Sequence, residues 1–390
     1  ALRIFLKGRP VPLSDVLPML ENMGLRVMSE VPYRIAPKGD AEPVWLHEFA
    51  LILRGAKGVE LARVSPEFEE ALQLVWAGAI ENDGFNRLVL AAGLSAREVT
   101  VLRAYAKYLR QIAIPFSQAY MENTLAQHPG IARLIVELFN ARLDPAPSGA
   151  HGRDGAEARI AGLLAEIERS LDGVANLDED RILRRFLDLV RATLRTNAFQ
   201  RVAGRRAQDG GLKPYLSFKL DSQRIDELPL PRPLVEVFVY SPLVEGIHLR
   251  GGRVARGGIR WSDRREDFRT EILGLMKAQM VKNAVIVPVG SKGGFYVKRP
   301  PPAEAGREAA LEEGIACYKT LIRGLLDVTD NITAAGIAPP PELVRHDGDD
   351  PYLVVAADKG TATFSDIANS VSRDYGFWLD DAFASGGSAG

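Results

Sequence analysis

Cysteine is almost absent from this sequence of 390 residues, in which Cys317 is the only one. A disulfide framework and a cysteine-rich metal site are therefore excluded. The scarcity of thiols fits a reducing compartment, and we expect a cytoplasmic protein. Cys317 itself is interpreted as a small, buried apolar residue.

An excess of charge and long apolar runs are also missing. The chain has 49 basic and 50 acidic residues and a net charge of −1, so bulk electrostatics give no reason to expect a nucleic-acid or membrane-surface partner. No uninterrupted apolar window approaches the length of a membrane-spanning helix, and the N-terminus lacks a signal-peptide pattern. With 46% hydrophobic and 25% charged residues, the composition is that of a folded soluble protein.

The order of the patterns predicts three parts. Residues 1–55 follow a β-α-β-β order, which favours a small α+β module of the ferredoxin-like (ACT) type. Residues 56–211 carry helical patterns and a Pro/Gly/Ser-rich stretch, and we interpret them as a scaffold. In residues 212–390 strands alternate with helices, which indicates an α/β domain with a largely parallel sheet. The chain starts without Met and ends in "SGGSAG", so we expect it to be part of a longer polypeptide.

One stretch of the last part, "VKNAVIVPVGSKGG", combines an apolar run with a lysine among glycines. We expect residues 284–289 to form a buried strand and Lys292 to lie in the loop that leaves its carboxyl end, where α/β sheets bind ligands. Glycines at 290, 293 and 294 allow close approaches that side chains would forbid, so we interpret them as room for a substrate. A solvated lysine on a tight turn is the alternative. A P-loop is excluded, since no Ser or Thr follows Lys292.

Two more segments have a similar composition. "ARGGIRW" places Arg256 before Gly257 and Gly258, and "VVAADKGT" carries a buried strand into Asp358. A carboxylate at a strand end is a candidate for acid–base chemistry, although an Asp before a helix is most often a cap. Lys282 lies at the C-terminal end of the helix before the apolar run. The helix dipole stabilises a cation there even when the cation binds no ligand.

Together, "ARGGIRW", "QMVKNAVIVPVGSKGG" and "VAADKGT" resemble, in the same order, segments of the amino-acid dehydrogenase superfamily. The segment "LRGGRVARGGIRWSDRREDFRTEILGLMKAQMVKNA" is most similar to the large NAD-specific glutamate dehydrogenases of bacteria. The resemblance covers the whole chain and is most specific over residues 251–294. It implies a substrate domain of the glutamate dehydrogenase type.

The resemblance also implies roles for individual residues. Lys292 matches the family's catalytic lysine, which helps water add to or leave the imino carbon. Asp358 matches the catalytic aspartate, which moves protons to and from the amino nitrogen. Lys282 matches the lysine that holds the substrate α-carboxylate. Gly257, Gly258 and Gly290 would line the substrate cleft.

Arg256 departs from the family, because ordinary glutamate dehydrogenases have a lysine that contacts the side-chain carboxylate there. Arginine is bulkier and bidentate, but it keeps a cation, and a buried cation favours a dicarboxylic substrate. L-Glutamate and 2-oxoglutarate are therefore the expected substrates. Two alternatives remain open: an NAD-dependent dehydrogenase of another amino acid, and a non-catalytic module that senses amino acids or serves as a scaffold.

The family's cofactor is NAD, yet no G-x-G-x-x-G unit occurs in the sequence. We therefore expect NAD to bind mainly to a Rossmann-type domain that follows residue 390, and we expect this chain alone to be inactive. The family is oligomeric, so a homo-oligomer is expected. The N-terminal module is a candidate site for an amino-acid effector, and a purely structural role is the alternative.

Overall fold

The computed structural model describes residues 1–36, 42–53, 61–146, 152–202, 211–282, 289–356 and 362–388. By contacts the chain separates into two compact units: Ala1–Arg103 with Ala119–Arg133, and Ala104–Gln118 with Leu134–Gly390. The predicted division at residues 55 and 211 stays a prediction. No described helix combines the length and the apolar character needed to cross a bilayer.

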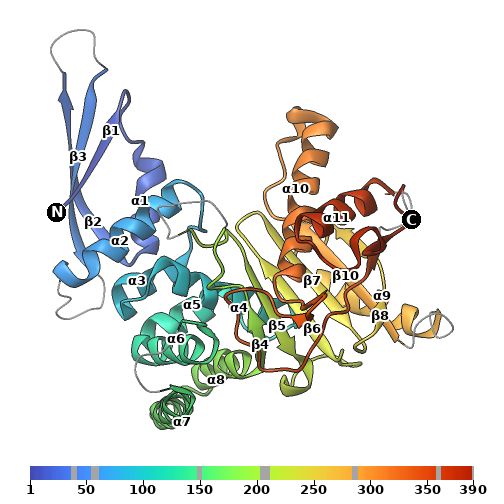
Figure 1. Cartoon of the computed structure of the whole chain (residues 1–390). Coiled ribbons are helices and arrows are strands. Elements are labelled where there is room, and N and C mark those ends of the chain that lie inside the picture. Colours follow the sequence, from blue (N-terminus) through green and yellow to red (C-terminus); the bar gives the residue numbers. More distant parts are fainter. Residues whose placement is uncertain are drawn as a thin grey trace. The chain divides into compact units, whose positions relative to one another are not determined.

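The first unit begins with a small antiparallel sheet (Figure 1). The elements follow the predicted β-α-β-β order along the chain: β1 (Leu2–Lys7), α1 (Leu13–Asn22), β2 (Leu25–Ile35) and β3 (Val44–Leu53). In the sheet, β3 lies in the centre and pairs with both β1 and β2. Helix α1 contacts β2 and buries Val16 and Leu20. Gly24 follows α1 with a φ of +83°, a left-handed conformation that glycine adopts without strain. A glycine in this conformation is typical of the end of a helix.

Helices dominate the middle of the chain, as predicted. They are α2 (Leu61–Trp76), α3 (Arg87–Ala92), α4 (Ala96–Gln111), α5 (Gln118–Gln127), α6 (Pro129–Leu143), α7 (Gly152–Leu171) and α8 (Leu177–Ala192). Helix α8 ends at Ala192, and Thr193–Thr196 form strand β4. The β-branched threonines of "TLRT" favour a strand, and β4 pairs with a neighbouring strand of the sheet described next.

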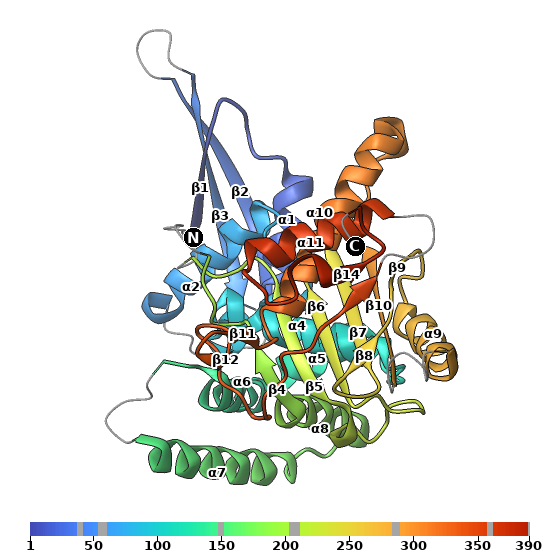
Figure 2. The same ribbon diagram turned by 45° about the vertical axis from the view of Figure 1, so that its right-hand side comes forward.

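The second unit contains a mixed sheet in the order β4-β5-β6-β7-β10-β8, with β9 also paired to β10 (Figure 2). The strands are β5 (Leu216–Asp221), β6 (Val235–Tyr240), β7 (Val244–Arg250), β8 (Ala255–Arg256), β9 (Ile259–Ser262) and β10 (Val289–Val297). Further along the chain lie two short pairs: β11 (Asn331–Thr333) with β12 (Gly336–Ala338), and β13 (Val355–Ala356) with β14 (Ala384–Ser385).

The prediction of a largely parallel sheet is wrong for the described strands. The pairs from β4 through β10 are antiparallel, and only β8 and β9 run parallel to β10. The reason lies in the connections. Strands β5, β6 and β7 follow one another without an intervening α-helix, and the turn between β6 and β7 is closed by a hydrogen bond from Ser241 N to Val244 O (2.8 Å). Short connections of this kind produce antiparallel neighbours.

Helices cover both faces of this sheet. Helix α10 (Gly306–Leu326) packs on β5, β6, β7 and β10, with α11 (Ala362–Asp374) beside it (Figure 2). The core on this side includes Val239, Phe295, Leu321 and Leu325. Helix α9 (Phe268–Lys282) packs on β10 and β7 from the other side. The strands between are buried on both faces, and every residue of Val235–Tyr240 is buried.

Candidate active site

The two glycine-rich segments that the sequence analysis linked lie side by side. Strand β8 pairs in parallel with the start of β10, which places Arg256 opposite Gly290. Three residues further on, Gly293 N donates a hydrogen bond to Gly258 O (3.0 Å). Gly257 and Gly258 are buried, while Arg256 is half-buried. The backbone thus brings together Arg256, Gly257, Gly258 and Gly290, which were predicted as substrate-binding residues.

Lys292 lies next to them, but not in the predicted loop. It occupies the middle of strand β10 opposite Leu249 of β7, and it is only 5% exposed. The prediction that Lys292 lies in a loop after a strand is therefore wrong. Of the apolar run at 284–289, only Val289 belongs to the described residues, and it begins β10. A solvated lysine on a turn is excluded by the same burial.

The direction of Lys292 follows from strand alternation. Residues two apart in a strand share a face, so Lys292 points to the same side as Gly294. A Cβ at Gly294 would lie 2.3 Å from Ile272 Cδ1 in helix α9. Lys292 consequently faces the side of the sheet that α9 covers, and α9 ends at Lys282.

The glycines after Lys292 have a different role from the predicted one. A Cβ at Gly294 would overlap Ile272, and a Cβ at Gly293 would come within 3.1 Å of both His248 and Ile259. Close packing within the protein therefore favours glycine at position 294, where Ile272 would have to move, and leaves little space for a side chain at position 293. These two glycines do not leave room for a substrate.

Two predicted residues lie beyond what the structure describes. Asp358 belongs to residues 357–361, which fall outside the described ranges. Lys282 is the last residue of α9, and only its backbone is described. The positions of these two side chains relative to Lys292 remain predictions.

Helix α9 is fastened to the sheet by a buried ion pair that sequence analysis missed. Arg269 Nε of α9 donates to Glu236 Oε2 of β6 (2.9 Å), and both side chains are fully buried. Tyr108 OH donates to the same carboxylate oxygen (2.9 Å). Burial lowers the pKa of Arg269, but the charge and hydrogen bonds of Glu236 outweigh it and raise the pKa above its ordinary value. The pair fixes the helix that ends at Lys282.

A buried histidine also escaped the sequence analysis. His248 of β7 lies opposite Gly293, is 1% exposed, and has no hydrogen-bond partner for either ring nitrogen within the described part of the chain. Burial, and next the charge of Arg250, lower its pKa to about 3, although Asp350 acts in the opposite direction. His248 is therefore neutral at physiological pH. A lone histidine in the strand "VEGIHLR" gave no signal in the sequence.

This histidine should make the protein sensitive to acid. The unfolded chain binds a proton at His248 below about pH 6.5, whereas the folded protein binds it only near pH 3. The free energy of unfolding should therefore fall as the pH drops from about 6.5 toward 3, by about 1.4 kcal/mol per unit from this residue. His248→Leu should remove that part of the slope, on the order of 3 kcal/mol between pH 6.5 and 4. Urea unfolding at several pH values measures it.

The same variant at pH 8 is the control for packing. His248 is neutral there in both states, so a difference from the unsubstituted protein at pH 8 reports only the change of side chain. Identical slopes for the two proteins between pH 6.5 and 4 would contradict the buried neutral imidazole.

Comparison with known protein families gives three matches along the chain. The family model "Bacterial NAD-glutamate dehydrogenase, catalytic domain" matches residues 166–390, which include all the residues predicted for the substrate site. The chain belongs to this family. "Glutamate dehydrogenase, helical motif 3" matches residues 80–145, and "Glutamate dehydrogenase, ACT3 domain" matches residues 1–64. The predicted order of an ACT-type module, a helical region and a catalytic α/β domain is confirmed at this level.

Individual relatives give the same result. The chain is 55% identical over 390 residues to the NAD-specific glutamate dehydrogenase of Halomonas elongata. It is 56% identical over 399 aligned positions to that of Mycobacterium tuberculosis, and 53% identical over 388 to that of Pseudomonas aeruginosa. These alignments cover 99–100% of this chain but only 23–24% of each relative. The chain thus spans about a quarter of the length of the curated relatives that it matches.

No cluster of His, Cys, Asp or Glu suited to a metal ion occurs in the part of the chain that the structure describes. The described strands that run parallel are β8 and β9 with β10, and β13 with β14. Together with the lack of G-x-G-x-x-G, they offer no recognisable Rossmann cradle for a dinucleotide.

Proposed function

We propose that this chain supplies the substrate-binding and proton-transfer residues of an NAD-specific glutamate dehydrogenase. The reaction is L-glutamate + NAD⁺ + H₂O ⇌ 2-oxoglutarate + NADH + NH₄⁺ + H⁺. The observation that carries the proposal is the pairing of two strands that bring Arg256 and the buried Lys292 into neighbouring positions. Membership in the family, whose named relatives are NAD-specific glutamate dehydrogenases, supports it.

In this proposal Arg256 and Lys282 bind the two carboxylates of glutamate. Two anchors at opposite ends of the substrate fix the position of Cα, from which hydride leaves, and such orientation can lower a barrier by several kcal/mol. Gly257, Gly258 and Gly290 allow the backbone to approach the substrate. Lys292 handles the water that adds to the imino carbon, and Asp358 moves protons at the amino nitrogen.

NAD would accept the hydride, and we propose that a domain outside these 390 residues binds most of it. The missing dinucleotide fingerprint supports this division. We also propose that the protein acts as a homo-oligomer in the cytoplasm, and that residues 1–55 can bind an amino-acid effector.

A substrate panel tests the activity. The full-length polypeptide, supplied with NAD⁺, should form NADH with L-glutamate at a kcat/KM on the order of 10³-fold or more above that with L-leucine, L-valine or L-phenylalanine. The reason is that an apolar side chain offers no carboxylate to the Arg256 cation. NADH absorbance measures the rate. Equal rates with an apolar amino acid would favour a dehydrogenase of another substrate, and no NADH with any amino acid would favour a non-catalytic module.

A further inference from the structure

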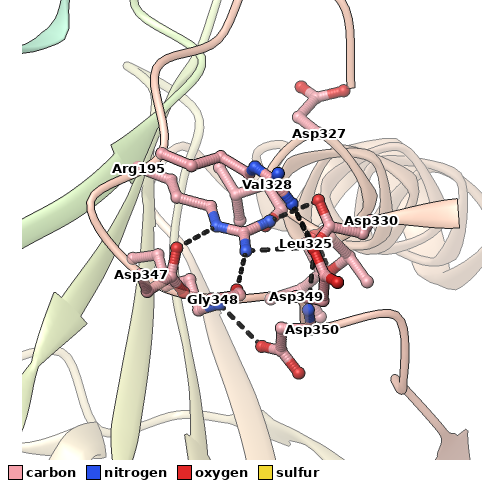
Figure 3. Close-up of polar contacts among 12 residues, drawn as sticks. Arg195, Leu325, Asp327, Val328, Asp330, Asp347, Gly348, Asp349 and Asp350 are labelled. Atoms are coloured by element: carbon pink, nitrogen blue, oxygen red, sulfur yellow. Dashed lines mark hydrogen bonds and ion pairs between the residues drawn. The ribbon is translucent and has the colours of Figure 1, made fainter. Parts of the chain in front are cut away.

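A group of buried ion pairs fastens one segment of the chain to the face of the sheet that α10 covers (Figure 3). Arg195 of β4 is fully buried and lies at its centre. Its guanidinium donates to Asp330 Oδ1 (2.8 Å), to Asp347 Oδ1 (2.6 Å) and to Gly348 O (2.8 Å). The segment 327–350, which follows α10, is thereby attached to the first strand of the sheet.

The end of this segment is held by a second arginine. Arg250, the last residue of β7, binds both carboxylate oxygens of Asp350, and its Nη1 also donates to Tyr352 O (2.8 Å). Lys219 Nζ of β5 binds Asp350 Oδ2 as well (2.6 Å). Burial raises the pKa of Asp350, but the hydrogen bonds and charges of Arg250 and Lys219 outweigh it and keep the carboxyl ionised. Arg250 and Asp350 are 6% and 9% exposed.

Arg250 is also a direct neighbour of the strand that carries Lys292. Its Cα partner in the β7–β10 ladder is Ser291, and Gly251 N donates to Gly290 O (3.1 Å). One side chain therefore connects the Asp350–Tyr352 segment, on the face that α10 covers, to the strand neighbouring β10, in which Lys292 points to the opposite face. From Tyr352 the chain runs on through Leu353 into strand β13.

We propose that Arg250 is a positioning residue for the dehydrogenase reaction: it holds the Asp350–Tyr352 segment against β7 and so supports, through the backbone ladder, the neighbouring strand β10 that carries Lys292. The inference rests on the proposed function, because it assumes that Lys292 is catalytic. A planar guanidinium can bind a carboxylate with two hydrogen bonds and a carbonyl with a third, whereas an ammonium cannot match this geometry. Arg250→Lys keeps the charge but loses part of the alignment.

Kinetics of the full-length enzyme separate positioning from stability. Arg250→Met should lower kcat for L-glutamate by about 10²-fold, the effect of a misplacement of about 1 Å. KM should change by less than about threefold, since Arg250 does not bind the substrate. Arg250→Lys should recover an intermediate kcat. Thermal unfolding of each variant shows what fraction is folded, and kcat is expressed per folded enzyme.

Lys213→Met is the matched control. Lys213 Nζ binds the buried Asp327 (2.5 Å) at the start of the same segment, so its loss also removes an ion pair that fastens the segment. It lies at the opposite end from Asp350. This variant should lose stability and keep kcat within about twofold, because its ion pair does not reach the residues beside Lys292.

Clear outcomes overturn the inference. A folded Arg250→Met enzyme with unchanged kcat, or a Lys213→Met enzyme with an equal loss of kcat, means that the ion pairs serve stability alone. If Arg250→Met does not fold, kcat is measured for Arg250→Lys and Asp350→Asn instead. An unchanged kcat in both folded variants also means that the ion pairs serve stability alone. Lys292→Ala, measured in parallel, separates the two hypotheses: an active Lys292→Ala enzyme refutes the proposed function, whereas an inactive one beside a fully active Arg250→Met refutes only the positioning role.

Discussion

Substitution of Lys292 by alanine should lower the kcat of the full-length enzyme by about 10²- to 10⁴-fold, the usual contribution of a positioned acid–base group. Lys292 is 5% exposed in the middle of β10, so water cannot readily take the place of its ammonium group. In the proposed mechanism, loss of this group removes the proton carrier for the water that attacks the imino carbon. Lys292→Arg should also be inactive, because a guanidinium stays protonated.

Steady-state formation of NADH from L-glutamate measures the loss, and Lys298→Met serves as the control. Lys298 follows the same strand and is also nearly buried, but it pairs with Glu245 (3.1 Å). Its removal should lower stability and leave kcat within about twofold, since it lies at the far end of β10. More than a few percent of turnover in the folded Lys292→Ala enzyme would remove Lys292 from the mechanism.

Substitution of Arg256 by leucine should lower kcat/KM for L-glutamate by about 10²- to 10⁴-fold. A carboxylate bound in an apolar site without its cation loses most of its binding energy. Arg256→Lys should keep most of the activity, because the resemblance to ordinary glutamate dehydrogenases implies a lysine at this position. The rate with L-norvaline, which lacks the side-chain carboxylate, should not fall in Arg256→Leu.

The control for Arg256 comes from the same segment. Arg260 lies four residues on, is about half exposed, and pairs with Glu271 (3.3 Å). Arg260→Leu should leave kcat/KM for L-glutamate within about threefold. Unchanged Michaelis constants in Arg256→Leu would mean that Arg256 does not hold the side-chain carboxylate. That result would support the alternative hypothesis of an NAD-dependent dehydrogenase of another amino acid.

Local patterns were sufficient for the small elements. The β-α-β-β order of the first module was predictable because its helix has apolar residues at helical spacing and is followed by Gly24, whose φ is +83°. The direction of the strands in the second unit was not predictable in the same way. Strands such as Val235–Tyr240 are buried on both faces, and a continuous apolar run has the same appearance in parallel and antiparallel sheets.

The site was predictable only as far as short segments reach. Arg256 and Gly290 could be linked by motif order, and the structure pairs them. The strand conformation of "GSKGG" could not be predicted, because glycines usually mark turns. Here they occur in a strand because Ile272, His248 and Ile259 crowd positions 293 and 294, and these neighbours are distant in sequence.

The amino-acid sequence by itself determined the family, the order of the modules and the residues with reactive groups, because these depend on residue types at short spacing. Only the tertiary structure decided that Lys292 is buried in a strand, that burial lowers the pKa of His248, and that Arg250 joins Asp350 to the sheet. Arg250 and Asp350 are 100 residues apart in sequence. Whether a charged residue is solvated or buried in an ion pair depends on which distant segments pack around it. The local sequence pattern does not predict those segments.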